Sequence, residues 1–266
     1  MPSDGQDDDL DGPAAPPLTL APLPDAGRRS KLSARVASQL VGYIVSNGIA
    51  PGSALPPERQ MVAQLGVSRG TLREALRMLE VHGLISLKPG PAGGPIVQRM
   101  AGRQLGLAST LHFHVAGATF REIWEARVIM EAVMARLAAE RNADEASQRL
   151  LAAVARAQEV DGSADETWVA AVSDFHTTIS ALSGNRVLDL WAVSFAEIWK
   201  IHTRGLTFPG EGRRRVSDAH HEIVRAVRDG DGELAYRLME QHNREMLAYV
   251  DERFPGLLDA VVPFTM

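Results

Sequence analysis

The chain contains no cysteine, which excludes disulfide bonds and thiol chemistry from its fold and its function. It also lacks any stretch near the roughly 18 consecutive apolar residues that a membrane-spanning helix needs. Its amino terminus is acidic and therefore unlike a signal peptide. We expect a cytoplasmic protein with no membrane partner.

Positive charge is missing from the first residues and concentrated in the segment that follows. Residues 1–27 hold six Asp and six Pro but no Lys or Arg, and we expect a disordered tail over residues 1–29. Residues 28–103 carry eleven Lys or Arg against three Glu, a formal charge of +8, whereas residues 104–266 carry 17 basic and 24 acidic groups, a formal charge of −7. Since a local positive surplus attracts a polyanion, residues 28–103 are expected to bind nucleic acid.

Residues 52–83 have the pattern of a helix-turn-helix. A first amphipathic helix is expected to stop at Gly66, and the Ser68 hydroxyl is placed to cap a second helix. An apolar stripe turns the second helix toward the core, which leaves hydrogen-bond donors at its outer, amino-terminal end. Those donors suit phosphates and guanine edges, and they are Arg69, Thr71 and Arg73.

A β-hairpin, or wing, is expected after the second helix. Residues 84–88 have a strand pattern, residues 89–95 are rich in glycine and proline, and an apolar pair follows. Lys88 adds positive charge, and Gly90 allows the backbone to approach a sugar-phosphate chain closely. The alternative is an ordinary surface hairpin beside a solvated helix pair.

Residues 101–255 have a helical pattern without the alternation of a sheet. A capping box at Thr119 and Glu122 predicts a helix to about Arg141, and another helix is expected after Asp144.

Four further predictions complete this region. We expect a helix over residues 165–184, a central and enclosed apolar helix over residues 186–204, and two helices over about residues 213–229 and 232–252. Six or seven helices are enough to enclose a ligand cavity.

Three histidines of this helical region are candidate ligands. His220 and His242 lie eleven residues either side of Asp231, so an antiparallel helix hairpin puts both about 16 Å from the turn and level with one another. His176 completes a cluster if its helix packs beside them. A hydrogen-bonded core or surface role is the alternative for each histidine.

The first part of this sequence resembles a known family. Segments that carry the resemblance are Leu55-Pro56-Pro57-Glu58-Arg59, Leu65-Gly66-Val67-Ser68-Arg69, Leu72-Arg73-Glu74-Ala75-Leu76 and Gly83-Leu84-Ile85, and they look like the winged-helix domain of GntR-type bacterial transcriptional regulators. The resemblance implies that operator DNA is touched by Arg59, Arg69, Thr71, Arg73 and Gly90, to which we add Ser68 and Lys88 as candidate contacts.

The helical part resembles the effector domain of the FadR subgroup, called the FCD domain. The matching segments are Arg127-Val128-Ile129-Met130-Glu131, Phe175-His176 and His220-His221-Glu222-Ile223, with His242. The resemblance implies a divalent metal, zinc or nickel, bound by one Asp and by histidines at the positions of His176, His220 and His242.

The Asp position of that ligand set is Val172 in this chain, so the predicted metal site is incomplete. Asp174 does not replace it, because two residues along a helix turn the side chain by about 200°. Three imidazoles can still hold zinc with water or an effector carboxylate as the fourth ligand. The alternative is a metal-free pocket in which the three histidines bind an anionic effector directly. Arg127 is a further candidate for an effector carboxylate, and an ion pair with Glu131 is its alternative.

Taken together, the residues predict a mostly α-helical protein. A winged helix-turn-helix with a small β-hairpin is expected over residues 30–100, an all-α effector-binding and dimerisation domain over residues 101–255, and a tail over residues 256–266. We interpret the chain as a ligand-responsive transcriptional regulator that binds double-stranded operator DNA as a homodimer. A repressor released by a small organic acid is the main hypothesis, with an activator as the alternative.

Two other classes stay open at this point. A zinc hydrolase built on the three histidines, with the winged helix as an appendage, lacks an HExxH motif and a partner base. A DNA-binding protein that senses no effector is the other alternative. The prediction is that the chain is not an enzyme.

Overall fold

The computed structural model describes residues 29–90, 93–99, 102–202 and 207–264. The expected tail up to residue 28 lies outside the described residues. The chain folds as two compact units, which divide between residues 100 and 101.

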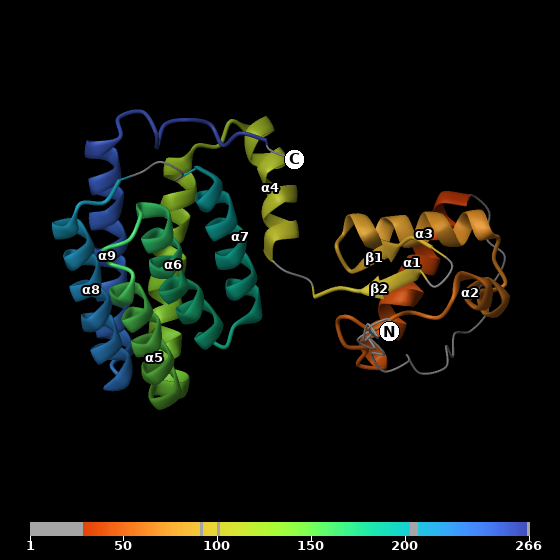
Figure 1. The fold of residues 1–266 in the computed structure, drawn as a ribbon, viewed down its shortest axis with the longest axis horizontal. Coiled ribbons are helices and arrows are strands. Elements are labelled where there is room, and N and C mark those ends of the chain that lie inside the picture. Colours follow the sequence, from red (N-terminus) through yellow and green to blue (C-terminus); the bar gives the residue numbers. More distant parts are fainter. Residues whose placement is uncertain (1–28, 91–92, 100–101, 203–206, 265–266) are drawn as a thin grey trace, which may run out of the picture. The chain divides into compact units, whose positions relative to one another are not determined.

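The first unit is a winged helix-turn-helix, as the sequence predicts (Figure 1). Strands β1 and β2 pair antiparallel, and a bridge from Ala54 to Ile96 adds a short third segment to the sheet. Its elements in chain order are α1 (Arg29–Ser46), α2 (Glu58–Leu65), α3 (Arg69–Val81), β1 (Ile85–Lys88) and β2 (Gly94–Val97).

The turn between α2 and α3 follows from two residues. Gly66 ends α2 in the left-handed conformation (φ 66°), which favours glycine. Ser68 caps α3, because its hydroxyl accepts a hydrogen bond from the Thr71 amide at 3.1 Å. The predicted inward stripe of α3 is confirmed, since every member is at least 96% buried: Leu72, Ala75, Leu76 and Leu79.

The second unit is all-helical in its described residues. The central helix, α5, packs against α6, α7, α8 and α9, and α4 packs against α7 (Figure 1). The helices are α4 (Gly102–Ala116), α5 (Phe120–Glu159), α6 (Asp165–Leu182), α7 (Arg186–His202), α8 (Gly210–Arg228) and α9 (Gly232–Arg253).

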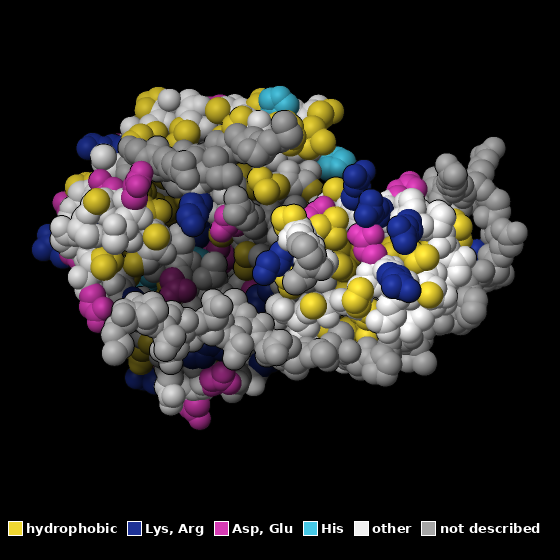
Figure 2. All heavy atoms as spheres, turned by 45° about the vertical axis from the view of Figure 1, so that its right-hand side comes forward, with side chains coloured by type: hydrophobic (Ala, Val, Ile, Leu, Met, Phe, Trp, Pro, Cys, Tyr) yellow, Lys and Arg dark blue, Asp and Glu magenta, His cyan; other side chains and the backbone are white. Residues whose placement is uncertain are grey.

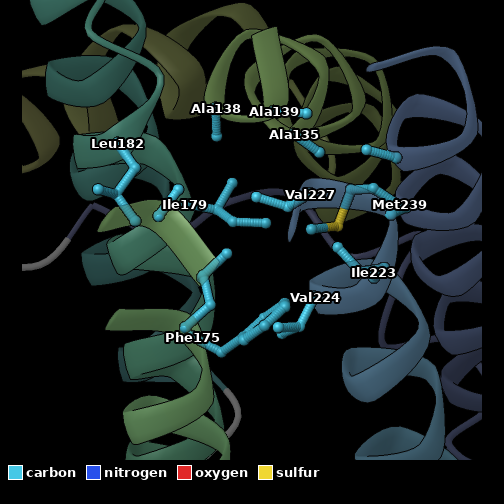
Figure 3. Close-up of a cluster of buried hydrophobic side chains, with 14 of the residues drawn as sticks. Ala135, Ala138, Ala139, Phe175, Ile179, Leu182, Ile223, Val224, Val227 and Met239 are labelled. Atoms are coloured by element: carbon cyan, nitrogen blue, oxygen red, sulfur yellow. The ribbon is translucent and has the colours of Figure 1, made fainter. Parts of the chain in front are cut away.

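The main core of the second unit is formed where α5, α6, α8 and α9 meet (Figure 3). Alanines on α5 let the neighbouring helices approach closely, and larger side chains from the other three helices fill the space between them. The residues labelled in Figure 3 come from α5 (Ala135, Ala138, Ala139), α6 (Phe175, Ile179, Leu182), α8 (Ile223, Val224, Val227) and α9 (Met239).

Two helix predictions are wrong. The expected break between Arg141 and Asp144 does not occur, and α5 runs unbroken for 40 residues from the predicted capping box at Thr119. The apolar helix α7 is not the enclosed one, because Val187 is 64% exposed and Leu190 is 42% exposed. The alanine-rich α5 takes the central position, since small side chains allow closer packing on all sides than the bulky residues of α7 do.

Part of the expected tail over residues 256–266 packs back onto the helical unit. Residues 257–262 return to the start of α5, where the Arg121 amide donates to the Leu258 carbonyl at 2.8 Å. The Val262 amide donates to the Ala118 carbonyl at 2.9 Å, and the Leu258 and Val262 side chains are buried. This segment therefore fastens the turn between α4 and α5.

Candidate functional site

The outer face of the winged helix carries most of the predicted DNA contacts as exposed side chains. Arg69 and Arg73 lie on the first turns of α3, Arg59 on α2, and Lys88 at the end of β1, and all are exposed. Gly90 is exposed at the wing in the left-handed region (φ 110°). Figure 2 shows one face of the first unit. Lys and Arg side chains gather on this face, with acidic side chains beside them.

Thr71 does not point outward as the sequence suggested. Its side chain is only 7% exposed, and its hydroxyl lies 2.9 Å from the Ser68 hydroxyl. The reason is helical periodicity, because Thr71 lies four residues before the buried Ala75 and shares its face. The cap at the amino-terminal end of α3 therefore holds Thr71 in place.

Arg73 is not an unpaired cation in the structure. Its Nε donates to Glu58 Oε2 at 3.0 Å, so the start of α2 is tied to α3. Both side chains are at least one third exposed, and such a surface pair contributes at most about 1 kcal/mol.

Replacing Glu58 by Gln is expected to tighten DNA binding by up to about fivefold, because Arg73 no longer has to leave a carboxylate to reach a phosphate or a base. Fluorescence anisotropy with a labelled duplex at fixed salt measures the effect. Glu74→Gln removes the same charge from α3 without breaking an ion pair that involves Arg73, so it is the control. An affinity no higher than that of Glu74→Gln contradicts a role for the Glu58 pair.

The second candidate site is a buried histidine cluster inside the helical unit. His176 comes from α6, His220 from α8 and His242 from α9, and the possible metal-binding atoms of the three lie within 4.8 Å of one another. All three side chains are buried. The Nε2 atoms of His220 and His242 are 3.2 Å apart, so the predicted level pairing across the α8–α9 hairpin is confirmed.

A buried carboxylate, which the sequence did not single out as part of this cluster, orients it. Glu131 on α5 is 5% exposed, and its Oε2 lies 2.7 Å from His176 Nδ1. Because an ionised carboxylate only accepts, His176 Nδ1 donates, and His176 Nε2 keeps the lone pair. Asn243 Nδ2 donates to the same oxygen at 2.9 Å, and Arg127 Nε donates to Oε1 at 2.8 Å.

Electrostatics favour an ionised Glu131 and neutral histidines. Burial raises the pKa of Glu131, but the Arg127 charge and the hydrogen bonds from His176 and Asn243 outweigh burial and hold that pKa well below its usual value. Burial lowers the pKa of His176, although Glu131 opposes this effect. Burial and the neighbouring histidines lower the pKa of His220 further, and burial followed by His176 lowers the pKa of His242 to about 3.

The helical unit is expected to lose stability as the pH falls below about 6.5. The pKa of His242 is about 3 in the folded protein and near 6.5 in the unfolded chain. At pH values between these two, the unfolded chain binds more protons than the folded protein, so a lower pH favours unfolding. The slope reaches about 1.4 kcal/mol per pH unit for each histidine shifted in this way. Glu131 does not contribute in this range, because its lowered pKa removes stability only below about pH 4.5.

Urea unfolding followed by tryptophan fluorescence tests this prediction, since all four Trp lie in the second unit. With a chelator present, the urea concentration at the unfolding midpoint should decrease as the pH is lowered from about 7 to about 5. The decrease should be less steep in His242→Gln. His82→Gln, at an exposed position of the first unit, is the control. Parallel pH profiles for all three proteins contradict the assignment of neutral buried histidines.

Three cavities each have one histidine of the cluster in their lining. A space of about 20 Å³, enough for one water, is lined by Arg127 and His176. A cavity of about 200 Å³ is lined by Val172 and His220, and one of about 430 Å³ by His242. The last two are large enough for a small organic acid. Of the two alternatives weighed for Arg127, the structure contains the ion pair with Glu131.

The donor set of the cluster fits a divalent metal. Zinc takes neutral imidazole nitrogens at about 2.0–2.1 Å in tetrahedral geometry, which separates two such nitrogens by about 3.4 Å. The 3.2 Å between His220 and His242 Nε2 agrees with that separation. A carboxylate that accepts from the far nitrogen of His176 is the usual partner of a metal-binding histidine.

None of the helices in the described part of the chain combines the length and the apolar character needed to cross a membrane.

Two family models match the chain, and together they cover more than half of it. The model described as bacterial regulatory proteins of the gntR family matches residues 32–92. The FCD domain model matches residues 122–245, which include Glu131 and all three clustered histidines.

Curated relatives match over most of their length. The HTH-type transcriptional repressor NanR of Cronobacter sakazakii is 28% identical over 258 residues, covering 93% of this chain and 94% of the relative. NanR of Escherichia coli K12 is 28% identical over 221 residues, covering 80% of this chain and 82% of the relative.

Among solved structures, Streptococcus agalactiae GntR has the same fold, with a TM-score of 0.66 and 23% identity over 82% of this chain and 99% of that one. The winged helix, the helical unit and these matches lead to one assignment. The chain belongs to the GntR family, in the FadR-like group with an FCD domain, and it is a ligand-responsive transcriptional regulator and not an enzyme.

Proposed function

We propose that this regulator is a dimeric repressor that leaves its operator when a small organic acid binds beside a metal ion in the helical unit. The observation that carries the proposal is the buried cluster of His176, His220 and His242 with its orienting carboxylate, Glu131. A site of this kind in a chain with a winged helix supplies both a place to bind a metabolite and a place to bind DNA.

For DNA, the exposed cations at the start of α3 are the expected readers of base edges. The amino-terminal end of the recognition helix enters the major groove in helix-turn-helix proteins, and Arg69 and Arg73 lie there. Arg59, Lys88 and Gly90 are proposed to contact the backbone on either side. Ser68 and Thr71 are proposed to act chiefly by fixing the helix end, because their hydroxyl groups contact each other.

For the effector, the three histidines would hold zinc or nickel through neutral nitrogens. A bound ion would supply positive charge that attracts a carboxylate. Glu131 keeps the donating nitrogen of His176 turned away from the cluster, so the remaining ring nitrogen faces His220 and His242.

Self-association is supported by exposed apolar side chains. Leu111 and Val115 on α4 are 46% and 79% exposed, and Val187 and Leu190 on α7 are similarly uncovered. Because one recognition helix reads only a few base pairs, two copies on a palindrome give useful selectivity. The name repressor for the NanR relatives supports repression as the direction of control.

The test begins with a duplex selected from a random pool by the full-length protein. A thermal-shift screen of sugar acids and hydroxy acids, with and without zinc, then identifies acids that bind. An acid that raises the melting temperature should lower affinity for the selected duplex, because it must bind the two arrangements of the protein differently. If acids stabilise the protein yet leave DNA affinity unchanged, the chain is an effector-insensitive DNA-binding protein.

A further inference from the structure

A block of negative charge precedes the first helix. Residues 1–27 carry six Asp and no Lys or Arg, and five of the six Asp lie within residues 4–11. The match to the gntR family model begins only at residue 32, so this segment lies before the part of the chain that the model describes. The segment leads into α1, which packs against α3, the proposed recognition helix. An anionic segment is therefore tethered to the unit that is proposed to bind DNA.

The outer face of α3 carries a row of three guanidinium groups. Arg69, Arg73 and Arg77 follow one another at intervals of four residues, so they share a face and are separated by about 6 Å of helix rise. All three are exposed. Arg73 pairs with Glu58, whereas Arg69 and Arg77 have no ion pair among the described residues. The row of about 12 Å is thus open to an anionic partner.

The aspartates of the segment have a spacing that fits this row. Asp7, Asp9 and Asp11 occupy alternate positions in the sequence. In an extended segment, alternate side chains point to the same side and repeat about every 6.6 Å. That repeat is close to the rise of about 6 Å between successive arginines of α3. One extended stretch can therefore place a carboxylate beside each guanidinium group.

Residues 1–27 are also long enough to reach any point of the first unit. Covalent geometry lets 27 residues extend up to about 90 Å from Arg29, whereas a compact unit of this size is about 30 Å across. A short tether gives its two partners an effective concentration in about the millimolar range. Several exposed charge pairs that are weak individually can then hold the segment on α3.

We propose that residues 4–11 bind along the outer face of α3 in the free protein and compete with DNA for it. The inference requires α3 to be the DNA-binding helix of the proposed function, but it is independent of the metal and of the effector. Because one face cannot hold both anions, the apparent DNA affinity is reduced by the fraction of molecules in which α3 is free. Salt screens the exposed charge pairs, so the competition weakens as the salt concentration rises.

The first test removes charge from the segment. Asp7→Asn combined with Asp9→Asn and Asp11→Asn should tighten binding of the full-length protein to the selected duplex by at least about fivefold at about 50 mM salt. At about 300 mM salt, the difference from the parent should shrink to about twofold or less. Fluorescence anisotropy measures both affinities.

A matched control separates local competition from the net charge of the protein. Three exposed acidic residues of the helical unit form no ion pair with another described residue, and they are Glu125, Glu166 and Asp218. Their replacement by Gln, Gln and Asn removes the same three charges at a distance from the segment. This variant should bind the duplex as the parent does, within about twofold.

The second test observes the contact directly. Because the chain has no cysteine, Ser3→Cys and Ala63→Cys place a donor and an acceptor dye on the segment and on the exposed side of α2. Energy transfer should decrease when the duplex is added at low salt, and also when salt is raised without DNA. In the same labelled protein with the three Asp→Asn changes, transfer should be low from the start. Excess unlabelled protein prevents transfer between two labelled chains.

Each outcome decides the inference. A salt-dependent gain in DNA affinity, absent from the control variant and accompanied by a loss of energy transfer on DNA binding, supports it. An equal gain in the control variant, no gain at low salt, or energy transfer that ignores both salt and DNA overturns it. None of these results bears on the metal site, and DNA binding by α3 is tested separately through Arg69 and Arg73.

Discussion

Replacing both Arg69 and Arg73 by alanine is expected to weaken binding to the selected duplex by at least about a hundredfold. Each arginine is exposed at the start of α3, and the loss of one guanidinium that reads a guanine edge costs about 1–3 kcal/mol. The two residues are four apart on one face, so both can reach the same groove. Anisotropy titrations at several salt concentrations measure the affinity and its salt dependence.

A matched pair of arginines in the helical unit is the control for net charge. Arg149 and Arg244 are both exposed and both form pairs with a glutamate on the same helix. Arg149→Ala with Arg244→Ala changes the charge of the protein by the same amount and should alter DNA affinity little. If the two double variants bind DNA alike, α3 is not the recognition helix.

Glu131→Ala is expected to destabilise the helical unit by about 3–5 kcal/mol. The change leaves Arg127 without its partner and removes the acceptor of His176 and Asn243, and a broken buried ion pair costs this much because one charge stays uncompensated. Urea unfolding followed by tryptophan fluorescence isolates this unit.

Two controls accompany this measurement. Glu131→Gln keeps the shape and part of the hydrogen bonding, so its loss should be smaller. Glu125→Ala removes an exposed glutamate from the same helix and should have little effect. A stability change for Glu131→Ala as small as that for Glu125→Ala would show that the network around this carboxylate contributes little to the fold.

The local elements of this fold were largely predictable from the sequence. Gly66, Ser68 and Thr119 act at helix ends through their own backbone and hydroxyl groups, which depend little on distant residues. The pairing of His220 with His242 was predictable for the same reason, because a short turn fixes the register of an antiparallel hairpin.

Features set by packing between distant segments were not predictable in this way. The choice of α5 over α7 as the central helix depends on how four other helices share alanine-rich surfaces. Thr71 is a different case, because its buried position follows from helical periodicity, four residues before the buried Ala75, and could have been predicted from the sequence. Glu131 joins the histidine cluster from 45 residues away in sequence, and its only local signal was the spacing from Arg127.

The central claim is that ligand binding at the histidine cluster of the helical unit controls the affinity of the winged helix for DNA. The most direct measurement is an anisotropy titration of the selected duplex with zinc-loaded protein, with and without an organic acid that binds in the thermal-shift screen. DNA affinity is expected to fall by at least about fivefold when the acid is present, and His220→Ala should abolish that response. An unchanged DNA affinity, or a response that persists in His220→Ala, would contradict the account.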